Sequence, residues 1–369
     1  MGWLVLAPSA LAAVLWLFAP GLLAVLAARQ RGFAALALAP AASAGIIAVA
    51  AIGASWLGVP WGPWPVAVLA VLTALAVAGL NGGLRLAAGR HRGPTAPKPL
   101  SRPRLSGWPK AARAAWIRSE RPYFWLGAAG AAALLTRHLR NILDRPDAFS
   151  QTYDNIFHMN AVRWILDTQD GSSLTLTAMT SGNQPPEFYP AAWHDFVSLV
   201  ALTTGDPLLA HACNAVIWAV MALAWPLGGL FLVQTLLRRL TPAGVLGAAV
   251  LTASFGAFPT LLVGFGVLYP NFLGFALLPA VLALTCQSLG LSAGRRPPTP
   301  LGLVLLAVAL TGLALAHPNA ALSYAAILVP LGLRWAWQGW RLRSAGRWRR
   351  PAGLVLGLAA AAVLWVKIR

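Results

Sequence analysis

The sequence predicts an all-α, polytopic integral membrane protein, with about ten transmembrane helices and amphipathic surface helices in a long outer loop. Of its 369 residues, 58% are hydrophobic and only 10% are charged, whereas a soluble domain carries about 25% charged residues. Too few ionic side chains remain to cover a water-facing surface. This composition excludes a cytosolic enzyme, a secreted disulfide scaffold and a disordered chain.

Stretches without Asp, Glu, Lys or Arg mark the expected spans. A helix needs about 20 apolar residues to cross roughly 30 Å of hydrocarbon, so the two longest uncharged stretches, 32–84 and 240–294, each hold two helices. We expect crossings at 3–28, 33–56, 65–84, 122–140, 207–237, 241–258, 270–290, 300–318, 320–340 and 352–367. The last apolar run, about 15 residues, is short for a crossing. We therefore expect the sequence to be truncated at its C-terminus.

Clusters of basic residues predict the orientation. If the ten spans alternate, all of the clusters fall on one side: Arg29 and Arg31, the segment 85–121, Arg238 and Arg239, Arg295 and Arg296, and the segment 334–350. By the positive-inside rule this side is cytoplasmic, which predicts an N-terminus outside a bacterial cytoplasmic (plasma) membrane. The net charge of +19 lies in these short clusters, so we expect membrane lipids and no nucleic acid as partners.

The charge pattern also predicts three parts of the chain. Residues 1–84 form an N-terminal three-span unit, 85–121 a basic cytoplasmic linker, and 122–369 a membrane core with an outer loop at 141–206. Eight of the nine acidic residues fall between Asp144 and Asp206. Because carboxylates serve as general bases and metal ligands, we expect any chemistry to be in this loop.

Two amphipathic elements stand out in the loop. The segment 150–168 has helical periodicity, and Asp154 and His158, four residues apart, are neighbours on one face of such a helix. The segment 188–205 is too short, and too polar at its start, to be a span. We expect both elements to lie flat on the outer membrane surface, apolar side down.

These residues resemble the GT-C superfamily of membrane glycosyltransferases. More closely, they are similar to polytopic proteins of actinobacterial type that share a YDxxFHxNAVRxIL outer loop and a later HPNA element, here Tyr153–Leu166 and His317–Ala320. The resemblance covers roughly 122–340. It implies transfer of a sugar, at the outer face, from a polyprenyl-phosphate donor to an envelope glycan or lipid acceptor.

The resemblance also implies a role for one acid. Asp154 matches the essential acidic residue of the superfamily's first outer loop, where it would orient or deprotonate the acceptor hydroxyl. Many members have two adjacent acids there, but Asn155 follows Asp154 in this sequence. We therefore expect no metal or other cofactor, and a divalent metal at Asp154 is the less favoured alternative.

The candidate catalytic residues are Asp154 and His158. For Asp154 the alternatives are a helix N-cap or a solvated loop acid. The candidate substrate-binding residues are Arg137, Arg140, Arg163, Glu187, His194, Asp195, His317 and Asn319. Arg137 and Arg140 would hold a lipid-linked phosphate bidentately, unless they extend to ordinary headgroups.

Two other classes of function compete with a transferase. A transporter or lipid permease would carry ionisable residues at mid-bilayer, but the expected spans contain almost none, His211 and His317 being the nearest. A non-catalytic envelope scaffold would use the acidic loop only for docking. A scaffold should tolerate Asp154→Asn, whereas an enzyme should not.

Overall fold

The computed structural model describes residues 2–90, 121–237, 240–293 and 299–341. This part of the chain is helical and contains no strand, which confirms the all-α prediction. The helices are η1 (Trp3–Leu6), α1 (Ala7–Ala27), α2 (Phe33–Trp56), α3 (Pro63–Arg90), α5 (Arg121–Leu143), α6 (Tyr153–Thr168), η2 (Leu176–Met179), α7 (Ala192–Thr204), α8 (Leu209–Ala219), η3 (Val220–Ala224), α9 (Trp225–Leu236), α10 (Pro242–Ser254), η4 (Gly256–Leu261), α11 (Leu262–Gly264), α12 (Tyr269–Ser288), α13 (Pro300–Ala316) and α14 (Pro318–Arg341).

The chain is a multi-pass membrane protein by the length and hydropathy of its helices. Six segments of the described chain are long and apolar enough to cross a membrane: Trp3–Ala27, Phe33–Trp56, Pro63–Leu86, Leu209–Leu236, Pro242–Gly264 and Tyr269–Ser288. Two shorter apolar helices, Pro300–Ala316 and Pro318–Leu333, follow them. The structure thus supports six spans rather than the expected ten or so. The expected span 352–367 and most of the linker 85–121 lie outside the described residues.

The chain divides into two compact units, Met1–Ala321 and Leu322–Arg369. In the first unit, α2 is buried along most of its length between α1 and α13. Small residues allow this close packing: a Cβ atom at Gly45 would overlap the Val308 carbonyl oxygen, and one at Gly312 would overlap that of Ala41. Close backbone approach through small residues is typical of packed membrane helices.

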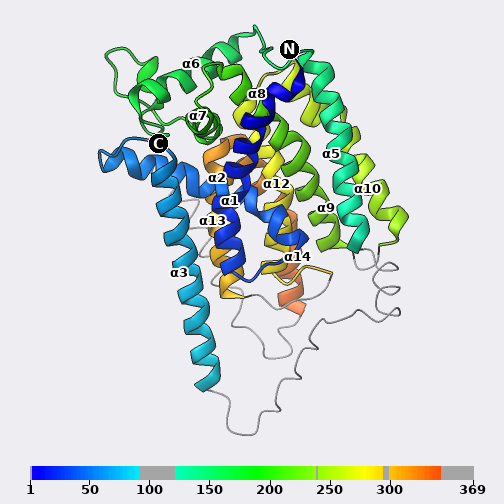
Figure 1. Ribbon diagram of the computed structural model, residues 1–369. Helices are drawn as coiled ribbons and strands as arrows, with labels where there is room; N and C mark the ends of the chain where they lie inside the picture. The colour runs from blue at the N-terminus through cyan, green and yellow to red at the C-terminus, as the bar shows by residue number, and fades with distance from the viewer. Residues whose placement is uncertain (1, 91–120, 238–239, 294–298, 342–369) are drawn as a thin grey trace, which may run out of the picture. The chain divides into compact units, whose positions relative to one another are not determined.

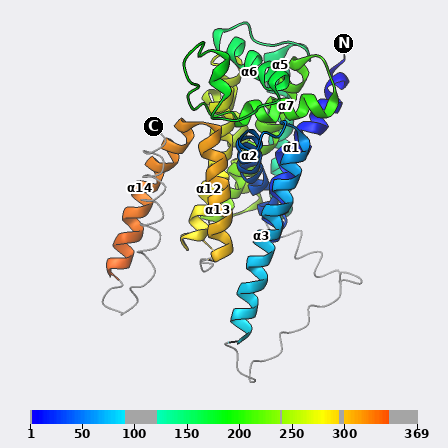
Figure 2. The same cartoon turned by 90° about the vertical axis from the view of Figure 1, so that its left-hand side faces the viewer.

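Helix α3 instead exposes apolar side chains. It extends away from the other helices of the first unit in both views (Figures 1 and 2). Val68, Val71, Leu72 and Leu75 are about half exposed or more. A contiguous apolar face of this kind suits contact with lipid rather than water.

The outer-loop segment forms a cap of α6, η2 and α7 over one end of the helices, on the side where the N-terminus lies (Figures 1 and 2). Hydrogen bonds attach the cap to the rest of the first unit. The Trp61 Nε1–H donates to Ser198 Oγ over 2.9 Å, and the Trp61 backbone N–H donates to the Gln169 carbonyl over 2.7 Å. The Asn214 amide donates to the Pro146 and Ala148 carbonyls. The segment is therefore folded onto the membrane helices.

The prediction that both cap helices lie on the membrane surface is wrong for α7. Every residue from Ala192 to Ala201 is buried, and α7 packs against α1, α2, α6, α8 and α12. A helix that is largely apolar on all sides belongs in an interior. The apolar face of α6, with Ala161, Val162 and Ile165, is buried as well, and α6 packs on α7.

Candidate functional site

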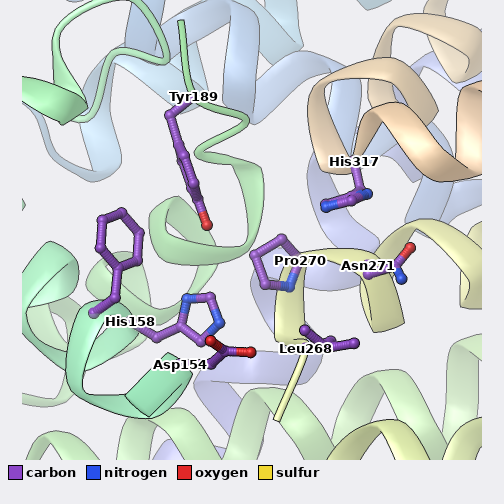
Figure 3. Close-up of a pocket in the computed structure, with 8 residues that line it drawn as sticks. Asp154, His158, Tyr189, Leu268, Pro270, Asn271 and His317 are labelled. Carbon is purple, nitrogen blue, oxygen red and sulfur yellow. The ribbon is translucent and has the colours of Figure 1, made fainter. Parts of the chain in front are cut away.

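A cavity of about 570 Å³ lies beside the first half of α6 (Figure 3). Segments far apart in sequence converge on it: the start of α6, the loop before α7, the start of α12 and the junction of α13 with α14. Its lining residues are Asp154, Phe157, His158, Tyr189, Leu268, Pro270, Asn271 and His317. The hydroxyl end of Tyr189 points toward the space between them (Figure 3).

Helix α6 brings Asp154 and His158 to the same cavity wall, as their spacing predicts. The helix N-cap is Thr152, and Asp154 lies in the first turn, so the N-cap alternative for Asp154 is wrong. A carboxylate in the first turn is favoured by the helix dipole. Asp154 is exposed whereas His158 is buried, so the wall pairs an accessible acid with an enclosed imidazole.

The His158 imidazole is held from two sides. Its Nδ1 lies 3.0 Å from the Nε2 of His194, and the backbone of Val267 lies close to the ring. Burial lowers the pKa of His158 to about 4, although the Asp154 carboxylate opposes the shift. Burial, reinforced by His158, holds the pKa of His194 well below its usual value. Both rings are therefore neutral near pH 7.

The two rings share one hydrogen bond, and their tautomers decide which ring donates. A neutral imidazole has one N–H and one acceptor nitrogen. His158 Nδ1 and His194 Nε2 therefore make one donor and one acceptor between them. This bond restricts the rotation of the His158 ring in the cavity wall.

Aromatic rings hold the two histidines in place. Trp193 stacks on Tyr269 with centroids 4.7 Å apart, and the His158 ring lies 5.4 Å from that of Tyr269. On the cavity side, the Phe157 and Tyr189 rings are 4.9 Å apart. Burial, and then the Asp154 charge, raises the pKa of Tyr189 to about 12, so its hydroxyl remains a proton donor.

The backbone beside the cavity is strained at Val267. This residue has φ of +50°, which is a genuine outlier for a β-branched side chain. Such strain costs about 1–3 kcal/mol and gathers at functional sites. Val267 is buried and directly precedes Leu268 of the cavity wall, so the strain lies where the start of α12 approaches His158.

Comparison with known sequences identifies the family of this chain. Residues 14–369 match the sequence model of DUF6541, which is described as a family of unknown function. The chain belongs to the DUF6541 family. Searches of curated proteins and of solved structures each found no match.

Four of the predicted site residues of this DUF6541 chain come together. Asp154, His158 and His317 line the cavity, and His194 adjoins it through His158. Burial lowers the pKa of His317. Asn319 is exposed beside the cavity, and its backbone N–H donates to His317 Nδ1 over 3.1 Å.

The other predicted site residues do not line the cavity. Arg137 and Arg140 are exposed on α5, where the Arg140 guanidinium lies 5.1 Å from the Trp3 ring. Arg163 pairs with Asp167, with Nη2 to Oδ1 at 2.7 Å and Nε to Oδ2 at 2.9 Å. The Glu187 side chain is exposed, and Asp195 is buried in α7. No arginine or lysine is among the lining residues.

Some lining residues were not among the predicted site residues. The sequence could have indicated Tyr189 and Asn271 as site residues, because each is a polar side chain beside a proline near an apolar segment. The sequence could not have indicated Leu268, Pro270 and Phe157, because residues of these types are equally common in a protein core. In the described part of the chain, no group of three or more His, Cys, Asp or Glu side chains could hold a metal ion.

Proposed function

We propose that the protein is an integral membrane glycosyltransferase of GT-C type, which moves a sugar from a polyprenyl-phosphate donor to a cell-envelope glycan or lipid acceptor. The observation that carries this proposal is the accessible Asp154 carboxylate beside neutral His158 in a cavity of about 570 Å³. Ligand pockets measure about 300–1,000 Å³ and combine apolar walls with a few polar groups. The resemblance of residues 153–166 and 317–320 to that superfamily supports the same reading.

The reaction needs one base. In our proposal the acceptor hydroxyl attacks the anomeric carbon and gives its proton to Asp154. The new bond joins the acceptor oxygen to that carbon, and the bond from the carbon to the phosphate oxygen breaks. Its electron pair leaves with the polyprenyl phosphate, so the departing oxygen needs no proton. Neutral His158 and the Tyr189 hydroxyl would hydrogen-bond sugar or phosphate oxygens.

Neutral donors would hold the phosphate in this site. The lining residues include no arginine or lysine, so the proposal does not depend on Arg137 or Arg140. An anion within about 4–6 Å favours the charged form of an imidazole. A bound phosphate would therefore raise the pKa values of His158 and His317, so donor affinity should increase as the pH falls.

The proposed orientation puts the cap outside a bacterial plasma membrane. Arg29 and Arg31 follow α1, at the end of that helix far from the cap (Figure 1). With the cap outside, these arginines are cytoplasmic, as the positive-inside rule requires. In this proposal α5, α13, α14 and the segment 352–367 add to the six apolar spans to give about ten crossings.

A complementation experiment tests the function. A strain lacking the gene is rescued with wild type, Asp154→Asn or Asp167→Asn at matched expression. Envelope glycans and accumulated polyprenyl-phosphate sugars are then measured. Loss of a positioned base costs about 10²–10⁴ in rate, so Asp154→Asn should fail, while Asp167→Asn, on the same helix but outside this cavity, should rescue. Rescue by Asp154→Asn would instead favour a transporter, lipid permease or scaffold.

A further inference from the structure

A pair of acidic residues, Asp195 and Asp170, lies in the cap, separate from the cavity. Asp195 on α7 has 0% of its surface exposed. Neither of its carboxylate oxygens has a hydrogen-bond partner among the described residues. Burying an ionised carboxylate without a partner is very unfavourable, so such groups are neutralised by a proton, paired with a cationic side chain or bound to a metal. The absence of a protein partner is therefore informative.

The Asp195 carboxylate reaches the turn that follows α6. A Cβ atom at Gly171 would lie 2.6 Å from Asp195 Oδ1, so only glycine leaves room for this approach. The preceding residue is Asp170. The turn thus begins with a second carboxylate, next to the point that Asp195 Oδ1 approaches.

Further oxygen atoms surround Asp170. Its Oδ2 accepts from the Thr175 hydroxyl over 2.8 Å and from the Ser55 hydroxyl over 3.1 Å, and its Oδ1 accepts from the Ser172 N–H over 2.9 Å. These bonds fix Asp170 against the end of α2. A fixed carboxylate and the Thr175 hydroxyl of the turn therefore lie beside the Ser55 hydroxyl of α2. The carboxylate of Asp195 has no partner among the described residues.

We propose that Asp195 and Asp170 bind a hard divalent cation of the Ca²⁺ class, which joins α7 to the 170–175 turn. Carboxylate and hydroxyl oxygens suit Ca²⁺, which accepts irregular sets of oxygen ligands, better than Mg²⁺, which requires near-octahedral geometry. Zinc prefers His and Cys ligands, and the neighbouring His194 is bonded to His158. The proposal is independent of the transferase function, because neither aspartate lines the cavity.

Terbium luminescence tests the site directly. Tb³⁺ occupies Ca²⁺ sites and emits when a nearby tryptophan is excited, and Trp61 Cε2 would lie 3.2 Å from a Cβ atom at Gly171. The full-length protein is titrated in detergent with Tb³⁺ and then with Ca²⁺. We expect emission that Ca²⁺ displaces, weakened about tenfold or more in affinity by Asp195→Asn, but retained in the matched variant Asp167→Asn. Emission that Ca²⁺ does not displace, or equal emission from both variants, would overturn the proposal.

Thermal unfolding separates a cation from a proton on Asp195. At saturating Ca²⁺ the wild-type midpoint should rise by at least about 3 °C relative to EGTA. Asp195→Asn should abolish this shift. If the wild-type midpoint is the same in Ca²⁺ and EGTA, a proton neutralises Asp195 and the site does not exist. This wild-type comparison decides the question even if Asp195→Asn does not fold, and Asp170→Asn then serves as the second variant.

Discussion

The Nδ1 atom of His158 lies 3.0 Å from the Nε2 atom of His194, and this bond joins the cavity wall to the buried helix α7. His158 lines the cavity but His194 does not. His194 is thus a positioning residue, which holds the His158 ring in one orientation. Asp154 lies on the same wall but is not bonded to His194. Mutation of His194 should therefore affect His158 without directly affecting Asp154.

We predict that His194→Ala reduces function and stability through His158. The change leaves a buried ring nitrogen without its partner, which costs about 1–3 kcal/mol. Thermal unfolding in detergent measures the stability, and the complementation assay measures function. His194→Gln, which keeps a donor, should recover part of both. His138→Ala, at an exposed position on α5, should stay within about 0.5 kcal/mol of wild type; equal losses at the two positions would contradict the prediction.

The buried histidine pair also predicts an acid-sensitive fold. The pKa of His158 falls from 6.5 in the unfolded chain to about 4 in the folded protein. Between these values the unfolded state binds the extra proton, so stability is full above pH 6.5 and falls as the pH drops toward 4. For His158 the loss reaches on the order of 3 kcal/mol, and His194 acts in the same direction.

The measurement is the difference in unfolding free energy between wild type and His158→Asn across this pH range. A difference is needed because Asp195 acts in the opposite direction. In EGTA, where the proposed cation is absent, its raised pKa makes the folded state retain a proton as the pH rises, so stability falls with increasing pH. Asp195 is present in both proteins and cancels. A difference that does not change between pH 6.5 and pH 4 would rule out this role for His158.

Local sequence patterns predicted one wall of the candidate site. The spacing of Asp154 and His158 determines their shared wall, because residues four apart meet on any α-helix. The opposite wall could not be predicted in this way. Leu268 and Pro270 lie more than 100 residues from Asp154 in sequence, and their approach depends on how α12 packs. His317 was identified only because a polar residue between two apolar helices requires a partner.

The cap shows why the expected position of α7 was wrong. The segment 188–205 is short and carries His194 and Asp195 in its first half, which fits a surface helix as well as a buried one. It is buried because the apolar face of α6 covers it, while α1, α2, α8 and α12 also pack against it. The surface position was also the basis for predicting His194 and Asp195 as substrate-binding residues. In the structure their polar groups are enclosed by the cap, and only His194 reaches the cavity wall, through His158.

Gly171→Ala should destabilise the cap. A methyl group there would lie 2.6 Å from Asp195 Oδ1 and within 3.3 Å of the Trp61 ring, so buried groups on two elements must move. Overpacking of this kind costs about 1–3 kcal/mol. Gly62→Ala is the matched control, because nothing lies within 4 Å of its Cβ position. Proteolysis of the 169–191 segment and thermal unfolding should both separate the two variants, and identical behaviour would show that the Asp195 approach is not tight.

Gly312→Ala should loosen the packing of α13 on α2. The added Cβ atom would overlap the Ala41 carbonyl oxygen and would lie 2.7 Å from the Gly45 nitrogen, both of which are backbone atoms that cannot rotate away. The helices must therefore separate and lose close contact along α2, which is buried over most of its length. Overpacking of this kind costs about 1–3 kcal/mol. Gly53→Ala on α2 is the control, since its Cβ position is open and alanine gains up to about 1 kcal/mol of helix propensity. Unfolding in detergent should thus move in opposite directions for the two changes. If Gly312→Ala were as stable as Gly53→Ala, contacts other than the Gly45–Gly312 approach would hold α2 and α13 together.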